Sequence, residues 1–389
     1  MPSINVTIAP DILTWALKQS ESDVLDESML LRVKQWIDGI KQPTFNQIEE
    51  LSKRTRIPLG YFFLKTPPSE EIKLVDFRTI DSAELANPSR ELIDTIYDME
   101  RIQAWLHNYR LNTGFGSCEA VGIAKGESKP IAIAKIIRDY LEIEPNWYEE
   151  TKGTEDSFSF IREKMNEIGI TVMMNGIVRN NTKRALNAEE FRAFAIVDDI
   201  APLVFINGAD SNGARLFSLF HELAHIIIGE NDLFNDRQRT VTSVSKQEKI
   251  CNGIAGELLV PGEAFVKEWE KCKTEDIYEK ISTIAKKFHC GLIVIARKAL
   301  DNGEISGNEY NGIAKKVIEF YYESKVDKKT GGGNYYNTQR SRVDRALVQT
   351  ICTALSDGSI TYPEAFRLTN TNMKTFPDLA NGLGGVSKW

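Results

Sequence analysis

Apolar residues recur at helical spacing along residues 1–66, in short runs separated by polar turns. Residues 11–17 and residues 47–52 both show this spacing. Thr44 precedes the second run, in the position of a helix cap. Residues 36–44 therefore read as a turn between two helices, and residues 1–66 are predicted to form a small helical domain.

The next segment, residues 67–116, is predicted to be a connector followed by one long helix. The helix is expected to be capped near Asn87-Pro88, because proline at the first helical position loses no needed donor. Apolar residues then recur on one face, as core packing requires. They are Leu92, Ile96, Met99, Ile102 and Leu106.

Residues 117–325 mix helical and extended patterns. Helices are predicted at residues 131–142 and 156–167. Three extended runs follow, at residues 169–174, 194–197 and 202–207. A short polar link joins the last two runs, so they are predicted to pair as a hairpin.

The last segment, residues 326–389, opens with a linker pattern. It reads VDKKT and then three glycines at 331–333, a composition typical of flexible linkers. A small helical tail is expected from about residue 338. The chain as a whole is predicted to be a multidomain, mostly helical α+β protein.

Composition narrows the class of protein. Hydrophobic residues make up 42% and charged residues 26%, as in ordinary globular proteins. The five cysteines, at positions 118, 251, 272, 290 and 352, form no Cys-x-x-Cys pair, which argues against a disulfide framework and a thiolate zinc site. No signal-peptide pattern and no membrane-length apolar stretch is visible, so a cytoplasmic protein without membrane contact is expected. A net charge of −7 argues against nucleic-acid binding by the whole surface.

The strongest chemical signal is His-Glu-Leu-Ala-His at residues 221–225, inside a helical apolar run. Positions i and i+4 share one helix face, so His221 and His225 can direct imidazole nitrogens at one Zn²⁺ ion. Glu222 is placed beside that ion as the catalytic base, which takes a proton from a water and returns it to the leaving amine. The alternative is a buried helix that carries two histidines by chance. Chance is disfavoured, because the whole chain has only four histidines and two of them stand at this spacing around a glutamate.

A catalytic zinc site needs a third protein ligand. Glu248 lies 23 residues after His225 (248 − 225), enough for a loop and a returning helix, and is the first candidate. Asn252 shares its helix face and could orient a metal ligand by a hydrogen bond without binding the metal itself. Glu257 is the second candidate. Either glutamate could instead lie on the surface of an amphipathic helix.

These motifs resemble the ImmA/IrrE family of zinc metallopeptidases. The resemblance is carried by HELAH, by EKICNGIAGELLVP after it, and by FRAFAIVDDIAPLVFING and ARLFSLF before it. Glu248 falls on the first glutamate of the family's second element, and Cys251 stands where alanine is usual. The resemblance implies a zincin-like, gluzincin-type peptidase domain with a small sheet.

The string WIDGIKQPTFNQIEELSKRTRIPLGYFFL resembles the second half of phage-repressor-type (XRE-like) helix-turn-helix domains. Residues 1–67 hold eight acidic and eight basic side chains, however, so no basic stripe for phosphates is visible. DNA binding by this domain and a role in protein packing both stay open. Residues 274–302 also resemble a helix-turn-helix, and there packing is the preferred interpretation.

The resemblance implies a narrow-specificity endopeptidase that cleaves a helix-turn-helix repressor or antitoxin-type protein, derepressing mobile-element, stress or toxin–antitoxin genes. The tail, from GGGNYYNTQRSRVDRAL onward, resembles members encoded beside a predicted nuclease toxin, and for its arginines and tyrosines a protein partner is favoured over nucleic acid. The alternative is a non-proteolytic, antitoxin-like regulator that binds DNA or a toxin and has a structural zinc site. The tail residues meant here are Tyr335, Tyr336, Arg340, Arg342 and Arg345.

A substrate segment is expected to pair with residues 202–207, taken as the edge of the cleft. No oxyanion-stabilising side chain is identified from the sequence. His107 and His289 are candidates, each with packing as the alternative. Arg192 and Arg215 flank the motifs, where ion pairing is the simplest role for them.

Overall fold

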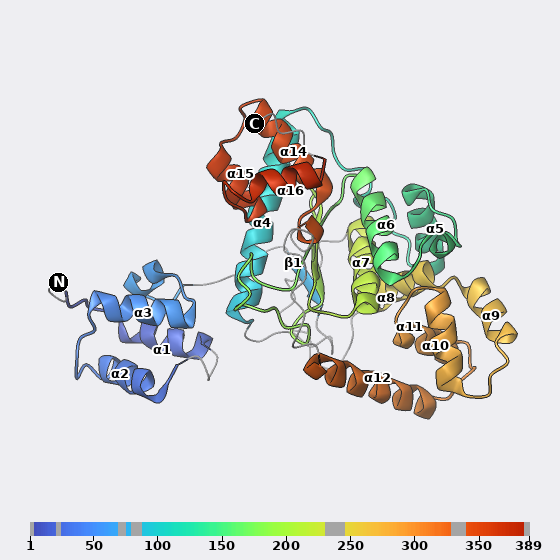
Figure 1. Ribbon diagram of the computed structural model, residues 1–389, viewed down its shortest axis with the longest axis horizontal. Coiled ribbons are helices and arrows are strands. Elements are labelled where there is room, and N and C mark those ends of the chain that lie inside the picture. Colours follow the sequence, from blue (N-terminus) through green and yellow to red (C-terminus); the bar gives the residue numbers. More distant parts are fainter. Residues whose placement is uncertain are drawn as a thin grey trace. The chain divides into compact units, whose positions relative to one another are not determined.

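The computed structural model describes residues 4–20, 25–68, 75–78, 88–229, 246–327 and 340–384. The chain divides into two compact units, of which the first comprises residues 1–73 and 85–96. The second comprises residues 74–84 and 97–389. Figure 1 shows the mostly helical chain with its small sheet, so the predicted α+β class is confirmed.

The first unit is helical. It contains α1 (Pro10–Gln19), α2 (Glu27–Ile37), α3 (Phe45–Thr55) and the 3-10 helix η1 (Leu59–Phe63). Their apolar faces meet in one core, in which Ile12, Met29 and Phe62 are fully buried. Thr44 caps α3 as predicted. Its hydroxyl accepts a hydrogen bond from the Gln47 N–H, and the Gln47 side chain accepts one from the Thr44 N–H.

The long helix α4 (Arg90–Asn112) runs from the first unit into the second. Its predicted apolar face is buried throughout, from Leu92 to Leu106. The cap lies slightly later than expected, because the Ser89 hydroxyl accepts a hydrogen bond from the Leu92 N–H. Asn87 itself lies outside the described residues.

The second unit contains one four-stranded sheet, with the order β1-β3-β4-β2. Its strands are β1 (Val75–Arg78), β2 (Thr171–Asn175), β3 (Ala193–Ile196) and β4 (Leu203–Asn207). β3 and β4 form the predicted antiparallel hairpin, and β2 runs parallel to β4. The expectation that residues 202–207 form a cleft edge is wrong, because β4 lies between β3 and β2 and both of its edges are paired.

Helices cover this sheet. α7 (Asn212–Ile228) packs against β3 and β4, and α8 (Lys246–Leu259) lies against α7. α5 (Pro130–Leu141) packs on α8, and α6 (Thr154–Glu167) packs on α7. Both α5 and α6 begin within two residues of the predicted positions. Their buried side chains join those of the sheet in one continuous core.

The helices after α8 extend this core. They are α9 (Gly262–Lys271), α10 (Ile277–Lys287), α11 (Leu292–Asp301) and α12 (Gly307–Asp327). α10 and α11 correspond to residues 274–302, the second segment that resembles a helix-turn-helix. Ile281 and Ile284 on α10 and Ile295 on α11 are buried in the common core. That burial agrees with packing as their role. α12 takes residues 326 and 327 into a helix, whereas the glycines at 331–333 lie outside the described residues.

The C-terminal segment is helical, as predicted, with α14 (Arg345–Ser356), α15 (Tyr362–Thr369) and α16 (Phe376–Gly382). One buried carboxylate anchors it to the sheet. Asp344 accepts hydrogen bonds from the Val172 N–H at 2.9 Å, the Asn166 amide at 2.8 Å and the Leu347 N–H at 3.0 Å. It thereby caps α14 and covers the outer edge of β2. The four domain boundaries read from the sequence stay predictions.

Candidate metal centre

The local sequence fixes both ends of the helix that carries the His-Glu-Leu-Ala-His motif. Ser211 caps the start of α7 by accepting a hydrogen bond from the Ala214 N–H at 3.3 Å. The helix ends at Gly229, with φ of +68°. A Cβ at this position would lie 2.4 Å from the Gly122 Cα, so the close approach of the two backbones requires glycine.

Burial on all sides holds α7 in place between the sheet and the neighbouring helices. Leu219, Phe220 and Leu223 are fully buried, and every residue from Ser218 to Ile228 is buried. A helix that is apolar all round is expected in such a central position. The two histidines of the motif are therefore presented by a rigid element, one turn apart.

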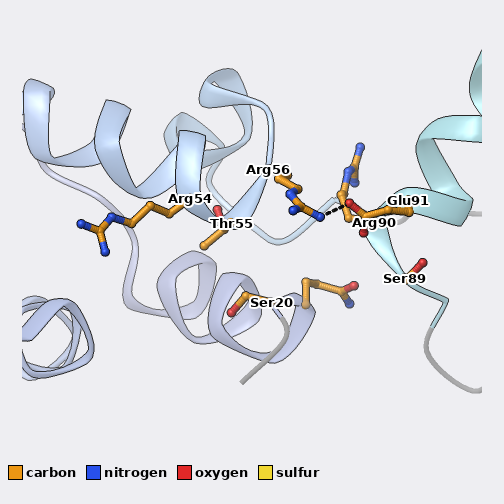
Figure 2. A pocket seen from close by; sticks show the side chains of 8 residues that line it. Ser20, Arg54, Thr55, Arg56, Ser89, Arg90 and Glu91 are labelled. Atoms are coloured by element: carbon orange, nitrogen blue, oxygen red, sulfur yellow. Dashed lines mark hydrogen bonds and ion pairs between the residues drawn. The ribbon is translucent and has the colours of Figure 1, made fainter. Parts of the chain in front are cut away.

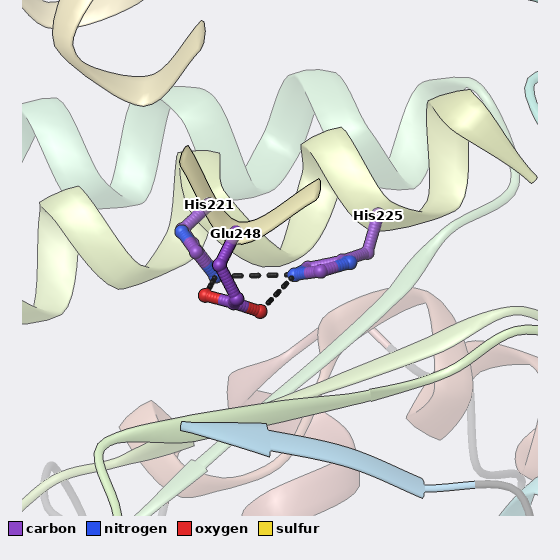
Figure 3. Close-up of side chains that lie close together, drawn as sticks. All are labelled: His221, His225 and Glu248. Carbon is purple, nitrogen blue, oxygen red and sulfur yellow. Dashed lines mark hydrogen bonds and ion pairs between the residues drawn. The ribbon is translucent and has the colours of Figure 1, made fainter. Parts of the chain in front are cut away.

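Three side chains from α7 and α8 converge on one point. The Nε2 atoms of His221 and His225 lie 3.1 Å apart, and each is 3.3 Å from a carboxylate oxygen of Glu248. Figure 3 shows the histidines reaching from α7 and the glutamate from α8. Among the residues placed by the structure, these three form the group that could hold a metal ion.

The spacing fits zinc. Bonds of 2.0–2.1 Å in a tetrahedral arrangement place neighbouring ligand atoms about 3.3–3.4 Å apart, close to the three measured separations. Two imidazoles and one carboxylate are also a donor set of catalytic zinc sites, which keep a fourth position open. Metal binding by His221, His225 and Glu248 stays a prediction that this geometry supports.

Glu248 is held in its charged form. Burial opposes ionisation, but hydrogen bonds with His221 and His225 outweigh it and hold the pKa of the Glu248 carboxyl well below its usual range. The histidine side chains are 1% exposed and that of Glu248 is 19% exposed. An ionised carboxylate beside two buried imidazoles provides the charge that a divalent cation requires.

Glu222 and Cys251 are neighbours of the two histidines, the first in sequence and the second in space. Glu222 follows His221 on α7 and is 1% exposed, so protein atoms rather than bulk solvent surround its side chain. The Cys251 sulfur lies 3.7 Å from Nδ1 of His225, the nitrogen that faces away from Glu248. The sequence marked Cys251 only as a small residue, and no pattern in a single chain would have indicated this contact.

Glu257 and Asn252, which the sequence also proposed for the site, do not belong to the converging group. Glu257 forms ion pairs with Lys298 at 2.7 Å and with Arg138 at 3.5 Å, and it is absent from the converging group. The Oδ1 atom of Asn252 is buried, and Asn252 makes no hydrogen bond to the three ligands within the part of the chain that is described. A supporting role for Asn252 therefore stays untested.

Both histidines considered for oxyanion stabilisation are engaged elsewhere. His107 pairs with Asp198 at 2.8 Å. His289 lies 3.0 Å from the Thr151 hydroxyl, and burial lowers the pKa of its imidazole. These contacts favour packing for both residues.

The arginines that flank the motifs and those of the tail contact polar or acidic side chains. Arg192 lies 3.5 Å from Asp210, and Arg342 donates a hydrogen bond to Asn180 at 3.1 Å. Arg215 contacts Asn212, and Arg345 lies 3.6 Å from Glu163. Tyr335 and Tyr336 lie outside the described residues.

A separate small pocket lies in the first unit, between the end of α3 and the start of α4 (Figure 2). Three arginines line it, but each faces a carboxylate. Arg56 pairs with Glu91, Arg54 with Asp26, and Arg90 with Asp94. These ion pairs offset the positive charge that an anionic ligand would need.

One family model matches the part of the chain that contains the converging group. No described helix combines the length and the apolar character needed to cross a lipid bilayer. The comparisons with curated proteins and with solved structures gave no match. Residues 165–300 match the Peptidase_M78 family, described as the IrrE N-terminal-like domain. This range contains β2, β3, β4, both histidines and Glu248, and the match supports a metallopeptidase-type function for this part of the chain.

Proposed function

We propose that this chain is a zinc-dependent endopeptidase of narrow specificity that cleaves a helix-turn-helix repressor or an antitoxin-type protein. One observation carries the chemical part of the proposal. Ligand atoms of His221, His225 and Glu248 lie 3.1–3.3 Å apart, and the buried Glu222 follows His221 in the sequence of the same helix. The regulatory substrate is proposed from the resemblance to the ImmA/IrrE family.

His221, His225 and Glu248 would hold the metal. A zinc ion bound there supplies Lewis acidity toward the scissile carbonyl and toward a water molecule. Glu222 takes the proton of that water and later delivers it to the leaving amine. Its burial excludes competing solvent, which strengthens its interaction with the reacting groups.

The alternative, a regulator with a structural zinc site, predicts a closed coordination shell. Structural zinc sites are almost always four-coordinate through protein ligands. Among the described residues the converging group has three members, and a buried glutamate, Glu222, directly follows one of them in the sequence. This arrangement favours a catalytic role.

The proposal is tested by identifying cleaved proteins in the native cell. The wild-type chain and Glu222→Gln are expressed at equal levels, and new protein N-termini are compared by mass spectrometry. We expect a small set of new N-termini, enriched in helix-turn-helix or antitoxin-type proteins, that depends on Glu222. Identical sets of N-termini from both chains would contradict the proposal.

A further inference from the structure

The outer edge of β3 is occupied by a strand from a distant part of the sequence. β1 comes from the connector before α4, and its four residues pair antiparallel with β3. The register joins Val75 to Ile196 and Arg78 to Ala193. β1 is thus added to the hairpin and β2 as a fourth strand.

This edge belongs to a strand that contacts the helix of the candidate metal centre. β3 packs against α7, the helix that carries both histidines. Figure 3 shows the three ligand side chains pointing from their helices toward the side on which the strands run, and β1 is drawn on that side. An extended peptide paired with β3 would run about 4.8 Å from it, in the place that β1 holds.

The rest of the described sheet offers no comparable edge. β4 is paired on both sides. The outer edge of β2 is covered by Asp344, which is fully buried and accepts a hydrogen bond from the Val172 N–H. An added strand with main-chain hydrogen bonds to the sheet therefore requires the outer edge of β3.

We propose that residues 75–78 are an intramolecular occupant of the substrate-binding edge, and that an extended segment of the protein substrate replaces them on β3. The inference rests on the proposed peptidase function, because displacing β1 matters only if β3 receives a substrate. In the resting protein the edge is closed by the chain itself.

The pairing is suited to displacement. β1 has four residues, fewer than the usual five or six of a strand, and in the described sheet β3 is its one partner. Main-chain hydrogen bonds hold it, and any extended peptide can form the same bonds.

Tethering makes β1 an effective competitor. β1 and β3 belong to one chain and to the same unit, residues 74–84 and 97–389, so β1 competes for the edge at a high effective concentration. A peptide without further contacts to the protein competes poorly with it. A protein substrate that also docks elsewhere can displace it, which accounts for narrow specificity.

The test uses the full chain with Glu222→Gln, so that no peptide is hydrolysed. Asp76→Pro with Phe77→Pro removes the ladder hydrogen bonds of β1, whichever of the two residues donates to β3. The matched control places the same two prolines at Glu70 and Glu71, in the connector but outside the strand. Circular dichroism and thermal unfolding establish that each variant is folded.

The probe is a fluorescent peptide with the sequence of residues 72–81, followed by anisotropy. We expect at least tenfold tighter binding to the strand variant than to the parent and the control, and no binding of a peptide carrying the same two prolines. Amide hydrogen exchange in Ala193–Ile196 should be faster in the strand variant alone. Equal peptide affinities for all folded chains would overturn the proposal.

A measurement on the unaltered sequence decides the question if the strand variant does not fold. In native-state hydrogen exchange, the β3 amides that face β1 should exchange at least tenfold faster than those that face β4. Equal protection on both sides would mean that β1 is a permanent strand. That result would leave a Glu222-dependent cleavage pattern in cells unaffected, so the two proposals fail separately.

Discussion

Helix α8 carries two glutamates with opposite surroundings, nine residues apart (257 − 248). Glu257 faces two side chains with permanent charge, Lys298 and Arg138, and also accepts a hydrogen bond from the Gly262 N–H. Glu248 faces two imidazoles, whose nitrogens can be neutral and offer lone pairs. The two residues are the same type of amino acid, so it is the side chains around them that distinguish the structural ion pair at Glu257 from the candidate metal ligand at Glu248.

Burial alone would not have distinguished them. The side chain of Glu257 is 11% exposed and that of Glu248 is 19% exposed. At Glu257 the negative charge is already balanced by fixed cations that join α8 to α5 and α11. At Glu248 the ionised carboxylate and two nitrogen donors converge on a point with room for an ion. The following predictions test this difference, from the largest effect to the smallest.

Glu222→Gln should reduce hydrolysis of the identified substrate by about 10²–10⁴-fold, because the amide cannot accept the proton of the attacking water. Zinc content should stay unchanged, since Glu222 is outside the ligand group. Single-turnover cleavage and elemental analysis of the same preparation measure both quantities. Full activity of the variant would remove Glu222 from the mechanism.

Glu257→Ala should lower the free energy of unfolding by about 3–5 kcal/mol, because Lys298 and Arg138 lose the carboxylate that balances them. Glu248→Ala in zinc-free protein should cost less, about 1–3 kcal/mol, because two buried imidazoles lose a hydrogen-bond acceptor but no cation loses its counter-charge of the Glu257 kind. Urea unfolding at pH 8 compares the two variants. Equal losses would mean that both glutamates are structural.

Zinc should stabilise the chain only through the Glu248 group. At a free zinc concentration 100 times the Kd, the free energy of unfolding should rise by about 2.7 kcal/mol. Thermal unfolding with buffered zinc should show this rise in the wild type and in Glu257→Gln, but not in His221→Ala. A similar rise in His221→Ala would place the metal elsewhere.

Cys251→Ala should have the smallest effect. Its sulfur is a weak hydrogen-bond partner 3.7 Å from Nδ1 of His225, so the loss in zinc affinity should stay within about tenfold, the low end for groups that orient a ligand. Competition with a zinc-binding dye measures the change. A loss greater than that would mean that Cys251 orients His225 far more strongly than a thiol contact should.

Local patterns predicted the parts of the fold that depend on neighbouring residues. The cap at Thr44 and the β3–β4 hairpin follow from short-range chemistry, and the structure contains both. The convergence of His221 and His225 follows in the same way from helical spacing. Glu248 needed a resemblance in addition, because spacing alone left Glu257 as an alternative.

The features that the sequence did not reveal depend on distant partners. A hairpin pattern shows that β3 and β4 pair, but not which strands lie outside them, so the prediction of β4 as an edge is wrong. The four residues of β1 carry too short a pattern to indicate a strand. Asp344 and Cys251 gain their roles from Val172 and His225, which are far away in the chain.

The most direct test of the central claim is zinc stoichiometry by elemental analysis on four chains: wild type, His221→Ala, Glu248→Ala and Glu257→Gln. Each is saturated with zinc and freed of excess by gel filtration. We predict about one zinc per chain in the wild type and in Glu257→Gln, none in His221→Ala, and a strongly reduced content in Glu248→Ala. No retained zinc in the wild type, or an equal content in all four chains, would contradict the assignment of His221, His225 and Glu248 as the metal ligands.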